Sequence, residues 1–147
     1  MKLSTRSRYG TRALLDIALH AQGGKILLRD VAQRQQISPM YLEHIITPLV
    51  ATEIIKSTRG AKGGVSLAKP AEQINLSEVI RILEGSITLV ECINNPNVCS
   101  RSKSCVTRDV WGELKKAMDG VLENLTLQDL VEQETSKEQS KEPMYYI

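Results

Sequence analysis

The order of elements in the first half of the chain constrains the fold more than any other feature of the sequence. Ser38 and Pro39 mark the start of a helix, because a serine hydroxyl caps free backbone N–H groups and a proline at the first helical position loses no hydrogen bond. A short helix over 29–35 precedes this start, and two strand-like runs, 53–57 and 65–68, follow the helix. This is the element order of a winged helix-turn-helix, a mainly α fold with a small β-hairpin wing.

The helix that starts at Pro39 has one apolar face, formed by Leu42, Ile45, Ile46 and Leu49. We expect its other side to face the major groove of DNA. The residues assigned to that contact are Ser38, Met40, Tyr41, Glu43 and His44. Pro48 lies inside the helix and predicts a kink or an early end there.

A glycine-rich turn with two basic residues joins the two strand-like runs. Its side chains and glycines could reach phosphates or enter a minor groove. The residues assigned to this contact are Arg59, Gly60, Lys62, Gly63 and Gly64. The turn is not a nucleotide-binding P-loop, since the Gly-Lys-Ser/Thr ending is missing.

The net charge of +2 conceals a strong asymmetry between the two halves of the chain. Residues 1–70 hold eleven Lys and Arg against four Asp and Glu, which leaves +7, whereas residues 71–147 hold eight against thirteen, which leaves −5. A polyanion partner for the first half and a solvated basic face are both consistent with charge alone. Together with the element order, the asymmetry favours DNA binding over a plain helical domain with a surface hairpin.

Helical periodicity also predicts a first helix over 7–22, a compact helix over 77–84, a long helix over 107–124 and a short last helix over 127–134. Ile26 to Leu28 could form a small strand, and the core must be aliphatic because the chain has no Phe. The long helix carries a short heptad seam, made of Trp111, Leu114, Met118, Val121 and Leu125. The polar segment from Glu134 to Pro143 is expected to be disordered.

All three cysteines, Cys92, Cys99 and Cys105, lie in a stretch without helical period, with six and then five residues between them. An odd number argues against a disulfide framework, and the close thiol pairs of structural zinc sites are absent. Three thiolates on one loop suit an iron–sulfur cluster, and nearby basic residues favour the thiolate form. Three reduced cysteines without metal, or a bound zinc ion, remain alternatives.

Other function classes find little support in the sequence. The two histidines lie in separate predicted helices without a nucleophile or acid grouped near them, so we do not expect an enzyme. No apolar run is long enough to span a membrane, so no membrane partner is expected. The N-terminus lacks the apolar core of a signal peptide, and we therefore expect a cytoplasmic chain.

Four motifs stand out together: the opening MKLSTRSRYG, the helix start SPMYLE at 38–43, the turn RGAKGG at 59–64 and the three-cysteine loop. In combination they resemble the iron–sulfur cluster regulators of the BadM/Rrf family of bacterial winged helix-turn-helix transcription factors. The resemblance implies a homodimer joined through the long C-terminal helix and its seam residues, which binds palindromic double-stranded DNA. It also implies a [2Fe–2S] cluster on the three cysteines and control of iron–sulfur cluster biogenesis genes.

By this resemblance the chain divides into four parts: a DNA-binding domain at 1–75, a helix and cluster loop at 76–106, a dimerisation helix and short following helix at 107–133, and a disordered tail at 134–147.

The sequence departs from the family pattern at two places. The first cysteine gap is six rather than five residues, and Arg108 stands where relatives with a histidine ligand have that residue. A guanidinium cannot ligate iron. The fourth ligand is therefore open, with Asp109, Glu91, a residue of a partner subunit and a small thiol as candidates.

Two other functions stay open at this stage. The ending Met144 to Ile147 resembles that of a cluster-free regulator of cysteine metabolism in the same family, which leaves a thiol- or metabolite-responsive regulator possible. A small metal- or redox-binding module that meets polyanions without sequence specificity is the alternative of a different class.

Overall fold

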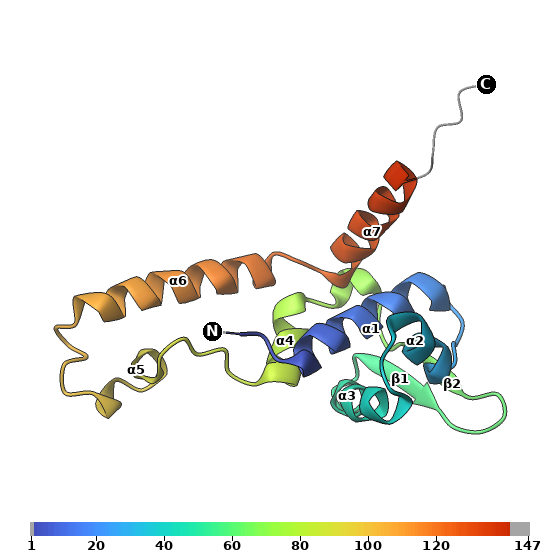
Figure 1. The fold of residues 1–147 in the computed structure, drawn as a ribbon, viewed down its shortest axis with the longest axis horizontal. Coiled ribbons are helices and arrows are strands. Elements are labelled where there is room, and N and C mark those ends of the chain that lie inside the picture. The colour runs from blue at the N-terminus through green and yellow to red at the C-terminus, as the bar shows by residue number, and fades with distance from the viewer. Residues whose placement is uncertain (1, 142–147) are drawn as a thin grey trace.

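A helical body with a β-hairpin carries a long helical arm on one side (Figure 1). The structure is a computed structural model and describes residues 2–141. In chain order its elements are α1 (Thr5–Ala21), α2 (Leu28–Gln35), α3 (Pro39–Ala51), β1 (Ile55–Thr58), β2 (Gly64–Leu67), η1 (Ala71–Gln73), α4 (Leu76–Glu84), α5 (Glu91–Asn94), η2 (Pro96–Val98), α6 (Val106–Glu123) and α7 (Leu127–Lys141). The predicted winged helix-turn-helix with a long C-terminal helix is confirmed. None of the helices within 2–141 has the length and apolar character needed to cross a bilayer.

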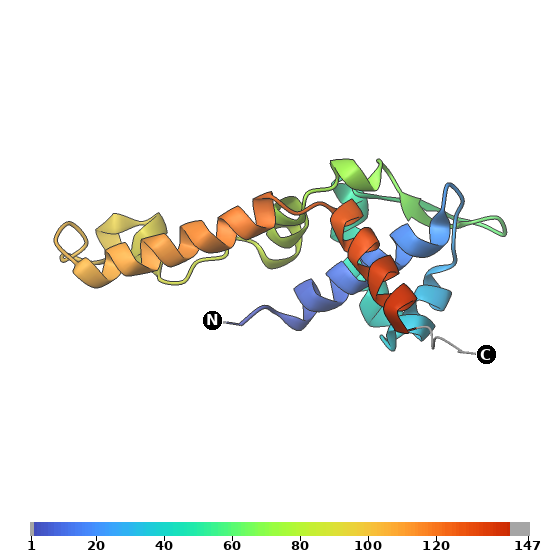
Figure 2. The ribbon, with the colours of Figure 1, turned by 90° about the horizontal axis from the view of Figure 1, so that it is seen from above.

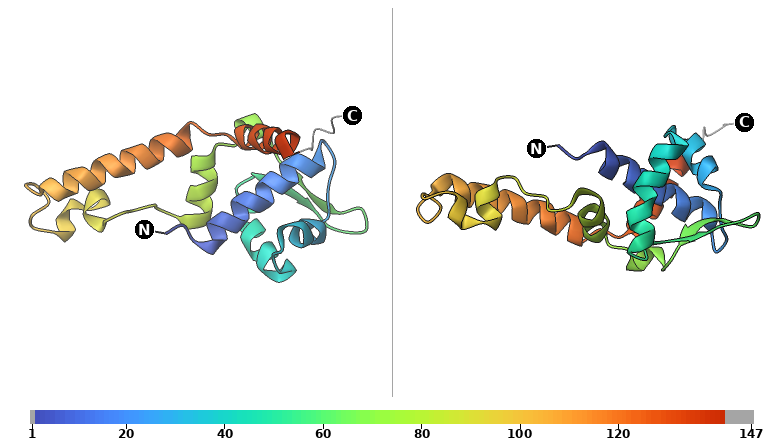
Figure 3. Two further views of the ribbon diagram at one scale, coloured as in Figure 1. Left: turned by 45° about the horizontal axis from the view of Figure 1, so that its top comes forward. Right: turned by 90° about the horizontal axis from the view of Figure 1, so that it is seen from below.

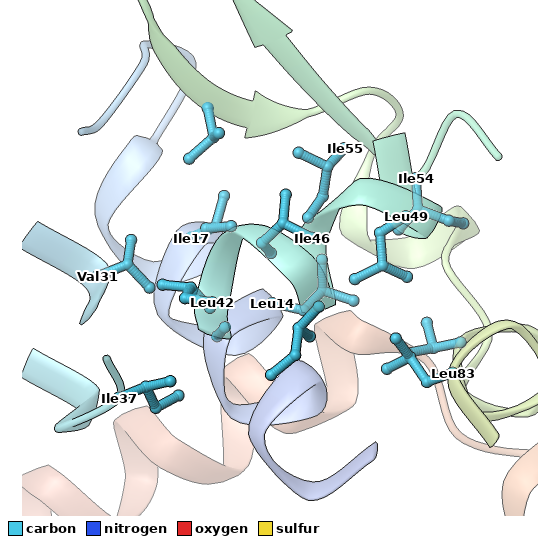
Figure 4. Close-up of a cluster of buried hydrophobic side chains, with 14 of the residues drawn as sticks. Leu14, Ile17, Val31, Ile37, Leu42, Ile46, Leu49, Ile54, Ile55 and Leu83 are labelled. Atoms are coloured by element: carbon cyan, nitrogen blue, oxygen red, sulfur yellow. The ribbon is translucent and has the colours of Figure 1, made fainter. Parts of the chain in front are cut away.

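We call α1 to α4 and the hairpin the winged-helix body, and residues 85–125 the arm. The core of the body consists only of Ala, Val, Leu and Ile side chains, as the lack of Phe predicts. Leu14 and Ile17 of α1 pack against Leu42 and Leu49 of α3 at its centre (Figure 4). Gly10 lets α1 approach the other helices closely, since a Cβ at this position would collide with Leu83 of α4.

The helix-turn-helix depends on local signals between α2 and α3. The α2 helix ends at Gln35, and the next residue, Gln36, has a φ of 55° that reverses the chain. The Ser38 hydroxyl then accepts a hydrogen bond from the Tyr41 N–H at 3.3 Å. An early end at Pro48 is wrong, because α3 continues to Ala51. Proline removes a single hydrogen bond at this point, and the burial of Ile45, Ile46 and Leu49 holds the helix together.

The wing is a two-stranded antiparallel sheet in which Ile55 pairs with Leu67 and Thr58 with Gly64. The expected small strand at Ile26 to Leu28 reduces to one isolated bridge between Ile26 and Val65, because α2 already begins at Leu28. This bridge fastens the hairpin to the end of α1.

The arm leaves the body after α4 and returns along α6, with α5 beside the first part of that helix (Figures 2 and 3). Two hydrogen bonds to backbone carbonyls hold the end of α6 to the start of α4. Asn75 donates its side-chain N–H to the carbonyl of Glu123 at 2.7 Å, and the Leu76 N–H donates to the carbonyl of Leu125 at 2.9 Å.

The last helix is longer than the sequence analysis expects. Thr126 and Asp129 cap its start reciprocally, and the fully buried Leu127 anchors it on the body. Helix α7 then continues to Lys141, so the expected short helix and the expected disorder over 134–141 are wrong. The Glu, Gln and Lys residues of this segment favour a helix once it has a fixed start. Residues 142–147, with the ending that begins at Met144, lie outside the described part.

Candidate DNA interface and cysteine loop

The residues predicted to read DNA lie together on the exposed first turns of α3. Ser38, Glu43 and His44 are exposed, and Met40 is 82% exposed although it is apolar. Tyr41 is half-buried and meets Tyr9 of α1 edge to face, with 6.2 Å between the ring centroids. The arrangement leaves the polar side of α3 open to a large ligand.

Glu43 makes no ion pair within residues 2–141. Arg34 does not pair with Glu43, because it donates three hydrogen bonds to Asp16, the shortest at 2.6 Å. The Glu43 carboxylate is therefore available to a ligand.

Asp16 itself is a buried carboxylate that joins α1 to α2, and sequence reasoning missed it. Its side chain is 1% exposed, and Gln35 donates a fourth hydrogen bond to it at 2.8 Å. The hydrogen bond with Asp16 raises the pKa of Arg34. The sequence signal is the acidic residue within the apolar stripe of α1, between Leu14 and Ile17.

A basic edge of α1 lies beside the start of α3. The Arg12 guanidinium stacks over the Tyr9 ring, 5.3 Å from its centroid, and donates to the carbonyl of Gln35 at 2.7 Å. Lys2 and Arg8 are exposed on the same N-terminal segment. This edge places positive charge beside α3, which itself carries no Lys or Arg.

The tip of the wing requires glycine. Gly60 has a φ of 100°, and a Cβ at Gly63 would collide with the backbone of Thr58 and Gly60. The tight turn leaves Arg59 and Lys62 exposed at the end of the hairpin, as a phosphate or minor-groove contact needs.

The three cysteines lie at the far end of the arm, and all of them are free thiols. Cys92 is in α5, Cys99 follows η2, and Cys105 caps α6. Arg108 donates a hydrogen bond from its Nε to the carbonyl of Cys92 at 3.0 Å, which ties α5 to the first turn of α6. The residue at the position of a histidine ligand thus has a structural role here.

The environment of Cys105 favours its thiolate. Hydrogen bonds from the Thr107 hydroxyl, 3.2 Å from the sulfur, and from the backbone of Arg108 lower the pKa of Cys105. The position at the N-terminus of an 18-residue helix acts in the same direction. Cys105 is thereby prepared to act as an anionic ligand or as a nucleophile.

Three thiols are the donor groups that iron–sulfur clusters use most. Within residues 2–141, no three His, Cys, Asp or Glu side chains gather closely enough to hold one ion. A two-iron cluster divides its ligands between two irons, and thiolates are its preferred ligands.

The loop also contains Ser102, a buried serine that sequence reasoning missed, whose Oγ has no hydrogen-bond partner.

The predicted seam of α6 lies on the surface of the described chain. Trp111, Leu114 and Val121 are 39%, 40% and 61% exposed, while Met118 and Leu125 are half-buried. An apolar pocket adjoins this face, and its lining includes Leu3, Leu89 and Met118. No residue of α6 is buried, and the apolar side chains of Trp111, Leu114 and Val121 stay exposed within the part of the chain that the structure describes.

The chain is similar to known regulators over almost its full length. A family model described as Rrf2, iron-dependent transcriptional regulator, matches residues 3–133. Protein rrf2 of Nitratidesulfovibrio vulgaris is 48% identical over 131 residues, which cover 89% of this chain and 87% of that protein.

Two solved structures share the fold and a third of the sequence. The structure of T. potens IscR has a TM-score of 0.76 and 34% identity, and the match covers 99% of this chain and 97% of that one. The oxidized form of Staphylococcus aureus CymR has a TM-score of 0.73 and 35% identity, with 90% and 97% covered. The arm as well as the DNA-reading unit is therefore common to these proteins.

Proposed function

The chain belongs to the Rrf2 family of transcriptional regulators, and on this premise we propose that it is a homodimeric, sequence-specific DNA-binding regulator that senses iron–sulfur cluster status. The relatives are transcription regulators rather than enzymes, and the winged-helix fold of the family implies DNA binding. The finer proposal is that Cys92, Cys99 and Cys105 hold a [2Fe–2S] cluster and that the DNA site is palindromic. A DNA partner implies action in the cytoplasm.

One observation carries the cluster proposal. All cysteines of the chain are free and lie in one loop of the arm, and the loop has basic residues but no Asp or Glu between Cys92 and Cys105. Such a loop favours thiolates and offers no carboxylate ligand between the cysteines; the nearest carboxylates in sequence are those of Glu91 and Asp109. When bound, an iron–sulfur cluster supplies a labile, redox-active link among thiolates.

Within this chain, the link would fasten α5 and the turn at Cys99 to the N-terminus of α6. Arg108 already holds the Cys92 backbone against the first turn of α6, and Cys105 stands directly before that turn. A structural change in the loop would thereby alter the first turn of α6, the helix that we propose as the dimer interface. The fourth ligand stays open among Asp109, Glu91, a partner-subunit residue and a small thiol.

The homodimer proposal rests on α6. An exposed apolar stripe that matches a heptad seam is self-complementary about a two-fold axis, which is the commonest symmetry of homodimers. A two-fold dimer would present two copies of α3, and two such copies read palindromic half-sites.

The test is anaerobic purification followed by iron and sulfide analysis. We expect brown protein with about equal iron and sulfide, as in a [2Fe–2S] cluster, and loss of most of the iron in Cys92→Ala, Cys99→Ala and Cys105→Ala. Ser100→Ala, an exposed change in the same loop, serves as the control. Full iron and an unchanged spectrum in all three cysteine variants would contradict the ligand assignment.

A second candidate is a thiol-responsive regulator of the same fold. The lowered pKa of Cys105 and the similarity to CymR favour it. This function predicts iron-free protein whose DNA binding changes on treatment with peroxide, and the change would be lost in Cys105→Ala. A module that binds polyanions without specificity would instead bind palindromic and random duplexes equally.

A further inference from the structure

We propose that Ser102 is a positioning residue whose hydroxyl donates a hydrogen bond to a sulfur of the bound cluster or its cysteine ligands, and so raises the cluster's reduction potential. This inference rests on the proposed function. It assigns a role to a residue that is neither a ligand nor part of the DNA interface.

The observation is an unpartnered buried hydroxyl. Residues 2–141 contain three buried polar side chains: Ser7, Asp16 and Ser102. The hydroxyl of Ser7 bonds to Glu84, and Asp16 accepts from Arg34 and Gln35. Ser102 is 6% exposed, yet its Oγ has no partner. Buried hydroxyls without a partner are rare in proteins, and a missing ligand is one of their ordinary explanations.

The position of Ser102 relates the hydroxyl to the thiols. Ser102 lies three residues from Cys99 and three from Cys105, and its backbone N–H donates to the carbonyl of Cys99 at 3.2 Å. Its neighbours Arg101 and Lys103 are exposed, so Ser102 is the one residue between these cysteines that turns inward.

The chemistry of the loop selects sulfur as the acceptor. No carboxylate lies in the sequence between Cys92 and Cys105, whereas the thiolates and bridging sulfides of a cluster are anionic acceptors. Reduction adds negative charge to the cluster, and a hydrogen bond to its sulfurs therefore stabilises the reduced form more than the oxidised form. The hydroxyl would raise the potential without changing the ligand set.

Removal of the Ser102 hydroxyl should affect the melting temperature of the iron-free and the cluster-loaded protein in opposite directions. In iron-free protein the Ser102 hydroxyl is buried without a partner, so its removal leaves the melting temperature unchanged or higher. In cluster-loaded protein the removal deletes a hydrogen bond. A serine that served only the packing of the loop would not produce this reversal.

The experiment compares wild type, Ser102→Ala, Ser102→Thr and the exposed control Ser104→Ala, all purified anaerobically as full-length protein. Iron, sulfide and the visible spectrum are measured first, then the ratio of reduced to oxidised cluster against redox dyes. We expect Ser102→Ala to keep its iron but to lower that ratio about threefold to tenfold at a fixed potential, where tenfold corresponds to about 59 mV for one electron. Ser102→Thr, which keeps the hydroxyl, and Ser104→Ala should retain the wild-type ratio.

The outcomes separate this inference from the proposed function. Wild-type protein without iron and sulfide overturns the proposed function and the inference with it. A loaded wild type whose ratio is unchanged in Ser102→Ala overturns the inference alone. A lower melting temperature of iron-free Ser102→Ala, relative to Ser104→Ala, also overturns it, because it would reveal a partner for the hydroxyl within the loop.

Discussion

The winged-helix body and the arm differ in how far their apolar side chains are buried. Every buried apolar side chain of residues 2–141 lies between Ala13 and Leu83, except Leu127 of α7. Helix α6, by contrast, has 18 residues and buries none of them. The body buries its apolar side chains within its own chain, whereas the arm leaves Trp111, Leu114 and Val121 exposed. In the dimer that we propose, burial of this apolar face would stabilise the arm.

The two regions also lie apart. The cysteine-bearing segment occupies one end of the molecule and the wing the opposite end (Figures 1 and 3). A change at the cysteine loop cannot directly touch the residues of the same chain that we propose to contact DNA. Helix α4, which packs against both α1 and α6, is the element through which the two regions meet.

The largest expected effect follows from charges placed on the apolar face of the arm. Leu114→Asp combined with Met118→Asp should yield a monomer, because two carboxylates cannot be buried in an apolar interface. The body should keep its fold, since α6 contributes nothing to its core. Analytical ultracentrifugation measures the mass and circular dichroism the fold. Lys116→Asp, at a well-exposed position of α6, is the matched control. A stable dimer of the double variant would show that the apolar face of α6 is not the dimer interface.

The same division explains what the sequence could predict. Features set within a few residues were predicted correctly. The Ser38 cap, the glycine turn at Gly60 and the helical spacing of apolar residues in α6 all follow from local chemistry. Pro48 misled the prediction, because packing of the neighbouring apolar side chains outweighs a single lost hydrogen bond. The end of α7 misled it as well, because polarity alone does not tell an exposed helix from a disordered segment.

Partners distant in sequence were beyond prediction. The periodicity of α1 shows that Asp16 faces inward but not that Arg34 meets it. In the arm, the spacing of the cysteines drew attention to the thiols, while the burial of Ser102 depends on how the loop closes. The ligand candidates could thus be read from the sequence, but the groups that surround them could not.

The second expected effect concerns selectivity within the body. Glu43 is exposed and has no ion pair in the described chain, and a carboxylate there is repelled by phosphates unless it accepts a hydrogen bond from a cytosine amino group. Glu43→Ala should therefore widen the set of bound sequences and lose about 1–3 kcal/mol of discrimination at one base pair.

Affinities for duplexes that differ only at that base pair, measured with iron-free and cluster-loaded protein, check this expectation. If the cluster acts by repositioning α3, the variant should bind alike in both states. Glu72→Ala, which removes an exposed carboxylate outside the predicted DNA contact, is the control. An unchanged preference of Glu43→Ala in both states would make the carboxylate structural and place the coupling elsewhere.

The third expected effect lies at the junction of the two regions. Hydrogen bonds from Ser4 and Ser7, at the start of α1, lower the pKa of Glu84 at the end of α4. A lowered pKa stabilises the fold above the ordinary Glu value of about 4.3, and this contribution is lost as the pH falls through the lowered value. Glu84→Gln should cost about 1 kcal/mol at pH 7, and the difference should shrink below about pH 4.

Urea unfolding at pH 7 and pH 3.5 measures this dependence, with the exposed Glu72→Gln as control. A difference of the same size at both pH values would show that the charge of Glu84 does not hold the junction.

The smallest expected effect is at the wing, at the end of the molecule opposite the cysteines. Lys62 is exposed on a turn held by Gly60 and Gly63, so its ammonium group can contact a phosphate with little loss of backbone conformational entropy. A phosphate contact adds affinity for every duplex alike and releases one counterion. Lys62→Ala should therefore weaken binding to specific and random duplexes by the same factor and reduce the slope of log affinity against log salt by about one. Lys103→Ala removes the same charge from the cysteine loop and should leave both quantities unchanged if only the body touches DNA. Equal slopes for wild type and Lys62→Ala would place the wing away from DNA, and a reduced slope for Lys103→Ala would show that the arm also meets the duplex.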